Sequence, residues 1–271
     1  MKAISSRDNP LVKRLHALAH SARERRKLGE TLLDGAHLLD AALQQPWPLK
    51  AIVVSDSGCA QAEIEGLLAR CAHGIPRYQL PDALFAHISP VDSPSGVTAI
   101  IDLPPEPDAV CPDVAAAAAS AAHSLVVLDA VQDPGNLGTI LRTAAAAGVR
   151  EVLLTAGCAG AWSPRALRAG MGAHFVLHIH ERVDAVHALG AFRGAILATA
   201  LGEGARSLYE LNLDAPVAWL FGAEGQGVSP ALLACASQRV IIPMAGDIES
   251  LNVAAAVAVC LFEQARQRRL P

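Results

Sequence analysis

The sequence predicts an α/β protein of two domains, and three observations support this fold class. Short apolar segments that suit strands alternate with periodic segments that suit helices along most of the 271 residues. Aromatic residues make up only 4% of the chain, so small aliphatic side chains must fill the core, as in parallel sheets covered by helices. A proline- and alanine-rich stretch over residues 104–123 interrupts the alternation and is interpreted as a linker.

The first domain is expected to span residues 1–103. Leu11, Leu15 and Leu18 recur every three or four positions and predict one helix over residues 10–28. Further helices are expected over 35–43 and 61–73, and strands over 51–54, 78–80 and 97–103. This alternation predicts a small α/β domain.

The second domain is expected to span residues 124–271. It opens with an apolar strand over 124–129, followed by a polar turn and a helix that ends at Gly148. Further strands are expected over 151–155, 174–180, 195–200, 217–222 and 240–243, with helices in the intervals and a last helix over 252–268. Strands that alternate with helices indicate a mostly parallel, doubly wound sheet.

Three polar segments of the second domain follow strands, at the sheet edge where open α/β sheets bind ligands. In the first, residues 133–142, Pro134 and Gly135 form a turn and Asn136 is well placed to cap the following helix. Arg142 is the only charged residue between Asp133 and Arg150. It is therefore either a surface residue or a ligand for an anion.

The second and third segments combine glycines with small polar residues. Residues 219–227 place Glu224 among glycines, which lets the backbone pass close to a ligand. Their GxxGxG spacing differs from the GxGxxG of dinucleotide-binding folds, and GxxxxGK[ST] is absent from the sequence. In residues 242–253, Ser250 and Asn252 stand beside Glu249 at the start of an Ala/Val-rich helix. One of them suffices as a helix cap, so the pair exceeds what a cap requires.

Basic residues are concentrated at the start of the chain. The net charge is −4, yet eight of the 22 Lys and Arg residues lie in the first 27 positions, where only Asp8 and Glu24 oppose them. Such a patch attracts phosphates, although a solvated helix face explains the charges equally well.

The cysteines and the apolar segments bear on the compartment. The six cysteines are scattered without a CxxC pair, which favours reduced thiols in a cytoplasm over disulfides or a zinc site. Residues 1–30 lack the apolar run of a signal sequence, and the longest apolar stretch, 251–262, is shorter than the roughly 20 residues of a membrane helix. His178 and His180 are interpreted as surface or packing residues of a strand, so no metal site is predicted.

Taken together, the three polar segments resemble the SpoU (TrmH-like) family of the SPOUT RNA methyltransferases. The matching stretches are residues 135–144, 221–227, 242–244 and 249–253. Residues 168–175 also resemble the family's RASMGAHF stretch, with Gly170 in place of the usual serine. The first domain more loosely resembles the L30e-like RNA-binding domain that precedes the catalytic domain in many members.

The resemblance implies a deep trefoil knot, a homodimer formed through the knotted domain, and S-adenosylmethionine as the cofactor. Knots are nearly absent from other proteins, so periodicity alone does not suggest one. The knotted loops are expected to hold the cofactor largely by their backbone. The implied cofactor-binding residues are Thr199, Ala200, Leu220, Gly222, Glu224, Gly225, Ile242, Met244, Ser250, Leu251 and Asn252.

The resemblance also implies methyl transfer to a ribose 2′-hydroxyl in structured RNA, without a metal. The implied catalytic residues are Asn136, Arg142, Glu224, Ser250 and Asn252. Arg142 would activate the hydroxyl, Asn136 would position it, and Glu224 would anchor its loop. Ser250 and Asn252 would orient the ribose or the cofactor. A guanidinium has a pKa above about 12 and accepts protons poorly, so we favour electrostatic stabilisation of the developing alkoxide by Arg142.

In this interpretation the basic segment binds RNA phosphates. The candidate residues are Arg7, Lys13, Arg14, Arg23, Arg25, Arg26 and Lys27. Both ribosomal RNA and transfer RNA are substrates within the family. The separate first domain favours ribosomal RNA, by analogy.

Two alternatives come from other functional classes. A non-catalytic RNA- or ribosome-binding protein on the same fold predicts degraded motifs, whereas all five implied catalytic residues are present. A nucleotide-dependent oxidoreductase is disfavoured, since the chain lacks GxGxxG and the acidic residue that follows it in such folds. Calorimetry with S-adenosylmethionine separates an enzyme from a scaffold.

Overall fold

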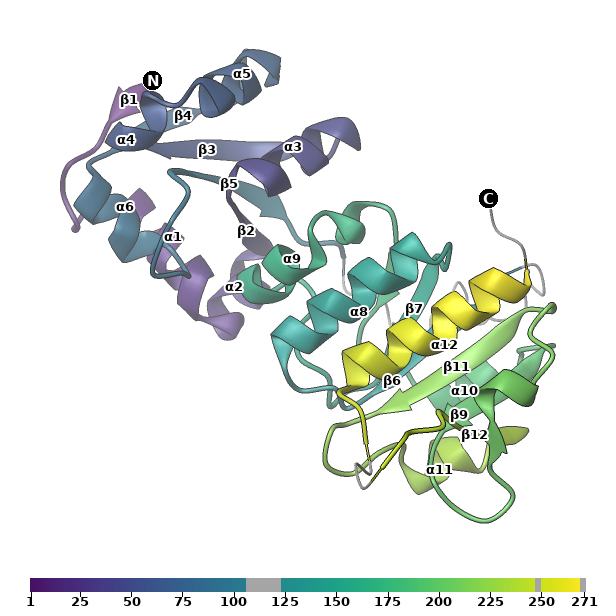
Figure 1. Ribbon diagram of the computed structural model, residues 1–271. Coiled ribbons are helices and arrows are strands. Elements are labelled where there is room, and N and C mark those ends of the chain that lie inside the picture. The colour runs from purple at the N-terminus through teal and green to yellow at the C-terminus, as the bar shows by residue number, and fades with distance from the viewer. Residues whose placement is uncertain (106–122, 247–249, 269–271) are drawn as a thin grey trace. The chain divides into compact units, whose positions relative to one another are not determined.

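The computed structural model describes residues 1–105, 123–246 and 250–268, which fold into two compact units (Figure 1). The first unit comprises Met1–Pro105 and Trp162–Phe175, and the second comprises Glu106–Ala161 and Val176–Pro271. Most of the predicted linker, residues 106–122, lies outside the described residues, as does Glu249.

The first unit contains a mixed five-stranded sheet in the order β1-β4-β3-β5-β2. Its strands are β1 (Lys2–Ala3), β2 (Glu30–Asp34), β3 (Leu49–Ser55), β4 (Arg77–Leu80) and β5 (Val97–Asp102). Strand β4 is parallel to β1 and β3, whereas β5 is antiparallel to β2 and β3. The sequence did not predict β2, because charged and polar side chains occupy three of its five buried positions.

The helices of the first unit are α1 (Pro10–His20), α2 (Ala22–Leu28), α3 (Ala36–Gln44), α4 (Asp56–Cys59), α5 (Ala62–Arg70), α6 (Asp82–Ile88), α9 (Pro164–Gly170) and the 3₁₀ turn η1 (Ala173–Phe175). The single helix expected over 10–28 is wrong, because the chain breaks at Ser21. That residue is extended, and its hydroxyl accepts a hydrogen bond from the Glu24 amide at 3.2 Å. A serine in this role satisfies a free amide of the second helix and so stabilises a new helix start.

The segment Trp162–Phe175 belongs to the first unit, although it lies between strands of the second unit in sequence. The Thr31 hydroxyl of β2 donates to the Trp162 carbonyl at 2.7 Å, and Arg168 of α9 pairs with Asp34 at 3.0 Å. The indole of Trp162 also stacks on that of Trp47. The strand expected over 174–180 is therefore wrong at its start, and only His178–His180 forms a strand.

The second unit contains a seven-stranded sheet in the order β10-β12-β9-β11-β6-β7-β8. Its strands are β6 (Leu125–Asp129), β7 (Glu151–Leu154), β8 (His178–His180), β9 (Ala195–Thr199), β10 (Arg206–Ser207), β11 (Val217–Gly222) and β12 (Gln238–Ile241). Every pairing in it is parallel, which confirms the predicted sheet type. The two-residue strand β10 was not predicted.

Helices cover both faces of this sheet. They are α8 (Pro134–Ala146), α10 (Ala185–Leu189), α11 (Pro230–Leu233) and α12 (Val253–Gln267), with a 3₁₀ turn η2 (Leu208–Glu210). Helices α8 and α12 lie side by side on one face (Figure 1), where the indole N–H of Trp219 donates to Gln264 of α12 at 2.9 Å. On the other face, apolar residues of α10 and α11 pack against Leu125, Ala198 and Leu220. The loops that follow β6, β9, β11 and β12 therefore emerge at one common edge of the sheet.

Candidate functional site

The loop after β6 presents Asn136 from the first turn of α8. Asp133, rather than the predicted Asn136, caps this helix, because its carboxylate accepts a hydrogen bond from the Asn136 amide at 2.8 Å. Pro134 occupies the first helical position, where a missing N–H costs nothing. The capping role therefore falls to Asp133, and the side chain of Asn136 is left available for other contacts.

Hydrogen bonds connect Asn136 to the other two polar segments. Its Nδ2 donates to Oε1 of Glu224 at 2.6 Å, and its Oδ1 accepts from Nδ2 of Asn252 at 3.1 Å. We call these three residues the Glu224–Asn136–Asn252 chain. Glu224 and Asn252 lie 88 and 116 positions from Asn136 in sequence, yet the fold brings the three residues together.

The chain of hydrogen bonds ends on the backbone of α12. Oδ1 of Asn252 accepts from the amides of Ala254 and Ala255 at 2.9 and 3.4 Å, so Asn252 is the cap of this helix. Because a helix N-terminus can only donate, it fixes which end of the Asn252 amide points towards Asn136. Asn136 keeps one N–H and one acceptor lone pair for a further group.

The glycine-rich loop after β11 folds back tightly on itself. The Gly227 amide donates to the Ala223 carbonyl at 2.9 Å, and Gly227 has a φ of +67°. A Cβ built on Gly222 would lie 1.9 Å from the Gly227 carbonyl carbon, so no side chain fits there. The turn leaves Glu224 and Gly225 exposed at the sheet edge.

Asp129 supports this edge, and the sequence analysis missed it. Its carboxylate accepts a hydrogen bond from the Thr155 hydroxyl at 3.1 Å and another from the Ser229 amide at 2.8 Å. Asp129 thereby holds the segment that follows the glycine-rich loop, at Ser229, beside the end of β6. A carboxylate at the end of an apolar strand was the signal that could have identified it.

The cofactor-binding candidates come from three neighbouring strands. The Thr199 hydroxyl at the end of β9 donates to the carbonyl of Leu220 in β11 at 3.2 Å, and Thr199 pairs in register with Val240 of β12. The side chain of Leu220 is fully buried, which leaves only its backbone near the edge. Ala200, Ile242 and Met244 follow the ends of β9 and β12. Ser250 and Leu251 are exposed immediately before the cap of α12.

Arg142 lies apart from the Glu224–Asn136–Asn252 chain. It is exposed on α8, six residues and so about 9 Å along the helix axis from Asn136. Among the described residues, no hydrogen bond or ion pair engages its guanidinium. A guanidinium on an otherwise small and apolar helix is therefore available to a phosphate or a developing negative charge.

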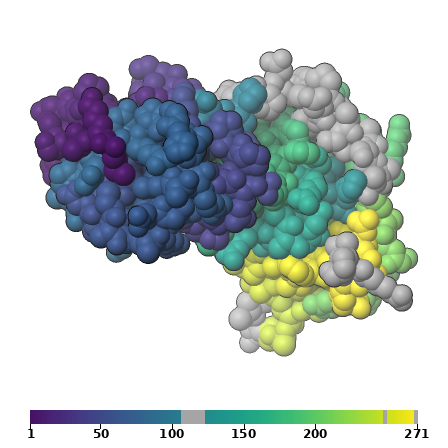
Figure 2. Space-filling model, turned by 90° about the horizontal axis from the view of Figure 1, so that it is seen from above, coloured from purple at the N-terminus to yellow at the C-terminus, as the bar shows by residue number. Residues whose placement is uncertain are grey.

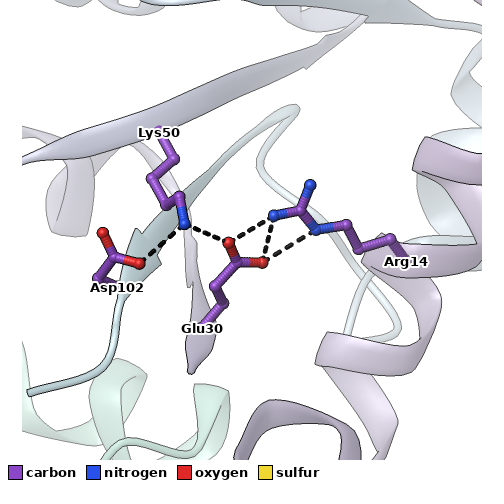
Figure 3. Close-up of polar contacts among 4 residues, drawn as sticks. All are labelled: Arg14, Glu30, Lys50 and Asp102. Carbon is purple, nitrogen blue, oxygen red and sulfur yellow. Dashed lines mark hydrogen bonds and ion pairs between the residues drawn. The ribbon is translucent and has the colours of Figure 1, made fainter. Parts of the chain in front are cut away.

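Arg14, a predicted RNA-binding residue, has an intramolecular partner instead. Figure 3 shows its guanidinium directed at the carboxylate of Glu30, which Nε contacts at 2.9 Å. Lys50 contacts the same carboxylate and also Asp102, at 2.5 and 2.9 Å. Burial alone would raise the pKa of Glu30, but the hydrogen bonds from Arg14 and Lys50 outweigh it and hold that pKa below its usual value.

Some of the other candidate RNA-binding residues also have an intramolecular partner, and others do not. Lys13 pairs with Asp8, Lys27 pairs with Glu24, and a guanidinium nitrogen of Arg25 donates to the Leu18 carbonyl at 2.8 Å. Three candidates are exposed without a hydrogen bond or ion pair among the described residues, namely Arg7, Arg23 and Arg26. Figure 2 shows the N-terminal segment, in dark purple, on the surface of the first unit.

His178 and His180 bond to a carboxylate of the neighbouring strand. His178 Nδ1 and His180 Nε2 contact the two oxygens of Glu151 at 2.6 and 2.9 Å. Across residues 1–105, 123–246 and 250–268, no group of three or more His, Cys, Asp or Glu side chains could hold a metal ion. No helix in these ranges is long and apolar enough to cross a bilayer.

Comparison with known proteins follows the division into two units. Residues 123–262 match the SpoU rRNA Methylase family, and residues 9–99 match the MRM3-like substrate binding domain. The 23S rRNA (guanosine(2553)-2′-O)-methyltransferase RlmP of Bacillus subtilis is 34% identical over 97% of this chain and 98% of its own. An uncharacterized tRNA/rRNA methyltransferase from Synechocystis is also 34% identical, over 98% of this chain and 94% of its own.

A solved structure extends the similarity to the fold. The AdoMet-bound rRNA methyltransferase from Sinorhizobium meliloti is 29% identical and superposes with a TM-score of 0.85. The match covers 100% of this chain and 99% of the other.

Proposed function

Because the chain belongs to the SpoU rRNA methylase family, we propose that it methylates the 2′-hydroxyl of a guanosine ribose in large-subunit ribosomal RNA. The reaction class and the cofactor follow from membership: it is an S-adenosylmethionine-dependent RNA 2′-O-methyltransferase. The guanosine is taken from the names of relatives, including RlmP, which is matched along nearly its whole length. One observation carries the proposal for this chain, namely the Glu224–Asn136–Asn252 chain that joins the three family segments at one sheet edge.

The residues present suit a cofactor held by backbone atoms. S-adenosylmethionine supplies a methyl group that is already electrophilic on its sulfonium. We propose that the loops after β9, β11 and β12 hold it, through Thr199, Ala200, Leu220, Gly222, Glu224, Gly225, Ile242, Met244, Ser250, Leu251 and Asn252. The absent side chain at Gly222 supports this assignment, because the tight turn keeps polar backbone groups exposed at the edge. Thr199 fixes the end of β9 against β11, which keeps the two loops in one place.

In the proposed catalytic site, Asn136 positions the reacting hydroxyl and Arg142 stabilises its developing charge. Asn136 is held at both ends of its amide, so its remaining N–H and lone pair can position the ribose hydroxyl. Among the described residues, Arg142 has no partner to compete with the substrate, and its guanidinium would stabilise the developing alkoxide and an adjacent phosphate. Glu224 anchors Asn136 through a hydrogen bond, and Ser250 and Asn252 would orient the ribose or the cofactor.

The proposed assembly is a homodimer of a knotted domain. A deep trefoil knot agrees with the strand order, in which the last strand, β12, lies between β9 and β10. Helices α8 and α12 are the proposed dimer surface, because Phe262 of α12 and the nearby Leu251 are large apolar residues with exposed fractions of 50% and 41%. Free thiols at every described cysteine support the proposed cytoplasmic location.

The first unit is proposed to bind the RNA. We assign the substrate-binding domain to residues 1–103 and the catalytic domain to 124–271, and the family matches over 9–99 and 123–262 support that division. Arg7, Arg23 and Arg26 are the strongest candidates for phosphate contacts, because no intramolecular acceptor among the described residues engages them. Lys13, Arg14, Arg25 and Lys27 would first have to leave their present partners.

The test has two parts. Purified protein is incubated with S-adenosylmethionine carrying a labelled methyl group and 23S rRNA or tRNA transcripts, and the labelled nucleotide is then mapped. We expect label on a guanosine ribose of 23S rRNA, and the same nucleotide should lose its methyl group in cells that lack the gene. A labelled base, or label confined to tRNA, would contradict the proposal. Absence of S-adenosylmethionine binding in calorimetry would instead support a scaffold.

A further inference from the structure

Three histidines of the first unit form a cluster that the catalytic proposal does not use. His16 and His20 lie four residues apart on α1, and His87 lies on α6. The ring centroid of His16 is 4.6 Å from that of His20 and 4.6 Å from that of His87. His20 and His87 are exposed and His16 is half-buried, so solvent and ligands reach the cluster.

The groups that act electrostatically on His20 and His87 are basic. Arg25 of α2 acts electrostatically on His20, and Arg7, which precedes α1, acts on His87. Burial, followed by repulsion from neighbouring basic groups, lowers the pKa of both His20 and His87.

The carboxylates on the same elements are engaged elsewhere. Asp8 bonds to Lys13, Glu24 to Lys27, and Asp82 of α6 to Ser57. Glu30 of β2, which packs against α1, bonds to Arg14 and Lys50. Among the described residues, no carboxylate forms a hydrogen bond or ion pair with any of the three imidazoles. The cluster therefore lacks an intramolecular counter-charge when it is protonated.

A phosphate group supplies the missing counter-charge. A bound metal is a poor occupant, because ligating imidazoles point a ring nitrogen at the ion, whereas His16 and His87 are stacked at an interplanar angle of 25°. A phosphodiester can accept hydrogen bonds from several imidazolium and guanidinium groups at once. Because the domain that carries the cluster matches a substrate-binding family, RNA is the favoured source of that phosphate.

We propose that His16, His20 and His87, with Arg7, form a phosphate-binding surface for RNA whose affinity rises as the imidazoles become protonated. The inference rests on the proposed RNA substrate. A phosphate beside an imidazole favours the charged form, so the pKa rises when RNA binds and the complex takes up a proton. Affinity is then highest at a pH below the imidazole pKa of both the free protein and the complex, and lowest at a pH above both. A rise in pKa of one unit on RNA binding corresponds to an affinity change of about tenfold.

The experiment measures binding of the full chain to a 23S rRNA transcript from about pH 6 to about pH 8, at constant ionic strength. We expect the wild-type protein to bind up to about tenfold more tightly at the acidic end. The double variant His20→Gln/His87→Gln should lose most of that dependence while keeping its affinity near pH 8. His73→Gln is the matched control, because His73 is an exposed histidine of the same unit outside the cluster. It should behave as the wild-type protein does.

Two outcomes would overturn the proposal. The first is a double variant whose pH dependence equals that of the wild-type protein while its thermal unfolding is unchanged. The second is the same proton-linked binding to polyglutamate but not to RNA, which would assign the cluster to an acidic protein partner. Methyl transfer is measured separately with the wild-type protein near pH 8. Failure of that assay would contradict the proposed function without altering the slope of binding against pH.

Discussion

One basic site in each unit uses its side chains in opposite ways. In the first unit, Arg14 and Lys50 both form ion pairs with the buried carboxylate of Glu30, so their charges are used for an intramolecular contact (Figure 3). In the second unit, Arg142 is exposed on α8 without an intramolecular partner among the described residues. Elsewhere at the same site, Glu224 and Asn252 are connected to one another through Asn136.

The difference separates stability from reactivity. A buried carboxylate is tolerated only when it is paired, so the first unit depends on its basic residues for folding. A catalytic guanidinium must be free to reach the charge that develops on the substrate, and Arg142, which is proposed for this role, has no hydrogen bond or ion pair among the described residues. Substitutions in the two places should therefore affect different measurements.

The largest expected effect on activity comes from Arg142. Arg142→Ala should lower kcat by about 10²- to 10³-fold, because an electrostatic donor to the reacting oxygen is lost. Arg142→Lys should recover only a small part of the lost kcat, since an ammonium cannot form the paired hydrogen bonds of a guanidinium. Thermal unfolding should be unchanged, because the side chain is exposed and unpaired.

Arg193→Ala is the control for Arg142, since Arg193 is also exposed in the second unit and no described residue forms a hydrogen bond or ion pair with it. It should retain normal kcat and normal stability. Near-normal turnover by Arg142→Lys would rule out a specific guanidinium role.

The reverse pattern is expected at Glu30. Glu30→Gln should lower the free energy of unfolding at neutral pH by about 2 kcal/mol, because Arg14 and Lys50 lose their shared charged acceptor. The kcat of the folded variant should be unchanged. Equilibrium denaturation and the methylation assay measure the two quantities.

The pH dependence provides a second readout for Glu30. Its pKa is lower in the folded protein than the ordinary value of 4.5, so its stabilisation is present above that value and is lost as the pH falls through the folded pKa. The difference between Glu30→Gln and wild type should therefore shrink in acid. Asp102→Asn is the control, since Asp102 is an exposed partner of Lys50. This substitution should lower the free energy of unfolding by less than about 1 kcal/mol. Equal losses in the two variants would contradict the proposed importance of Glu30.

The smallest effect is expected from the free arginines of the first unit. Arg23→Ala and Arg26→Ala should leave folding unchanged and weaken RNA binding modestly. Each should flatten the slope of log affinity against log salt concentration by about 0.7 to 0.9 if it contacts one phosphate. Arg193→Ala is again the control, because Arg193 is exposed but is not among the candidate RNA-binding residues. An unaltered slope in both arginine variants would identify them as solvated surface residues.

The sequence predicted the second unit better than the first. Its apolar strands are continuous and most are followed by a helix, so the strands, their parallel direction and the edge that carries the polar loops followed from the pattern, whereas the strand order did not. In the first unit the sequence missed β2, because Glu30, Thr31 and Asp34 look like residues of a turn. Their buried positions depend on Arg14, Arg168 and the Trp162 carbonyl, which are distant in sequence.

The sequence by itself identified the family and the three segments that carry it, because these depend on residue types at fixed spacings, and the family resemblance in turn implied the cofactor. The tertiary structure decided how those residues are used. It assigned the helix cap to Asp133, connected Asn136 to Glu224 and Asn252, and placed Trp162–Phe175 in the first unit. It also divided the basic residues into paired and free ones. Hydrogen bonds and ion pairs depend on distances across the fold, and residues 16 or 116 positions apart can meet only after the chain has folded.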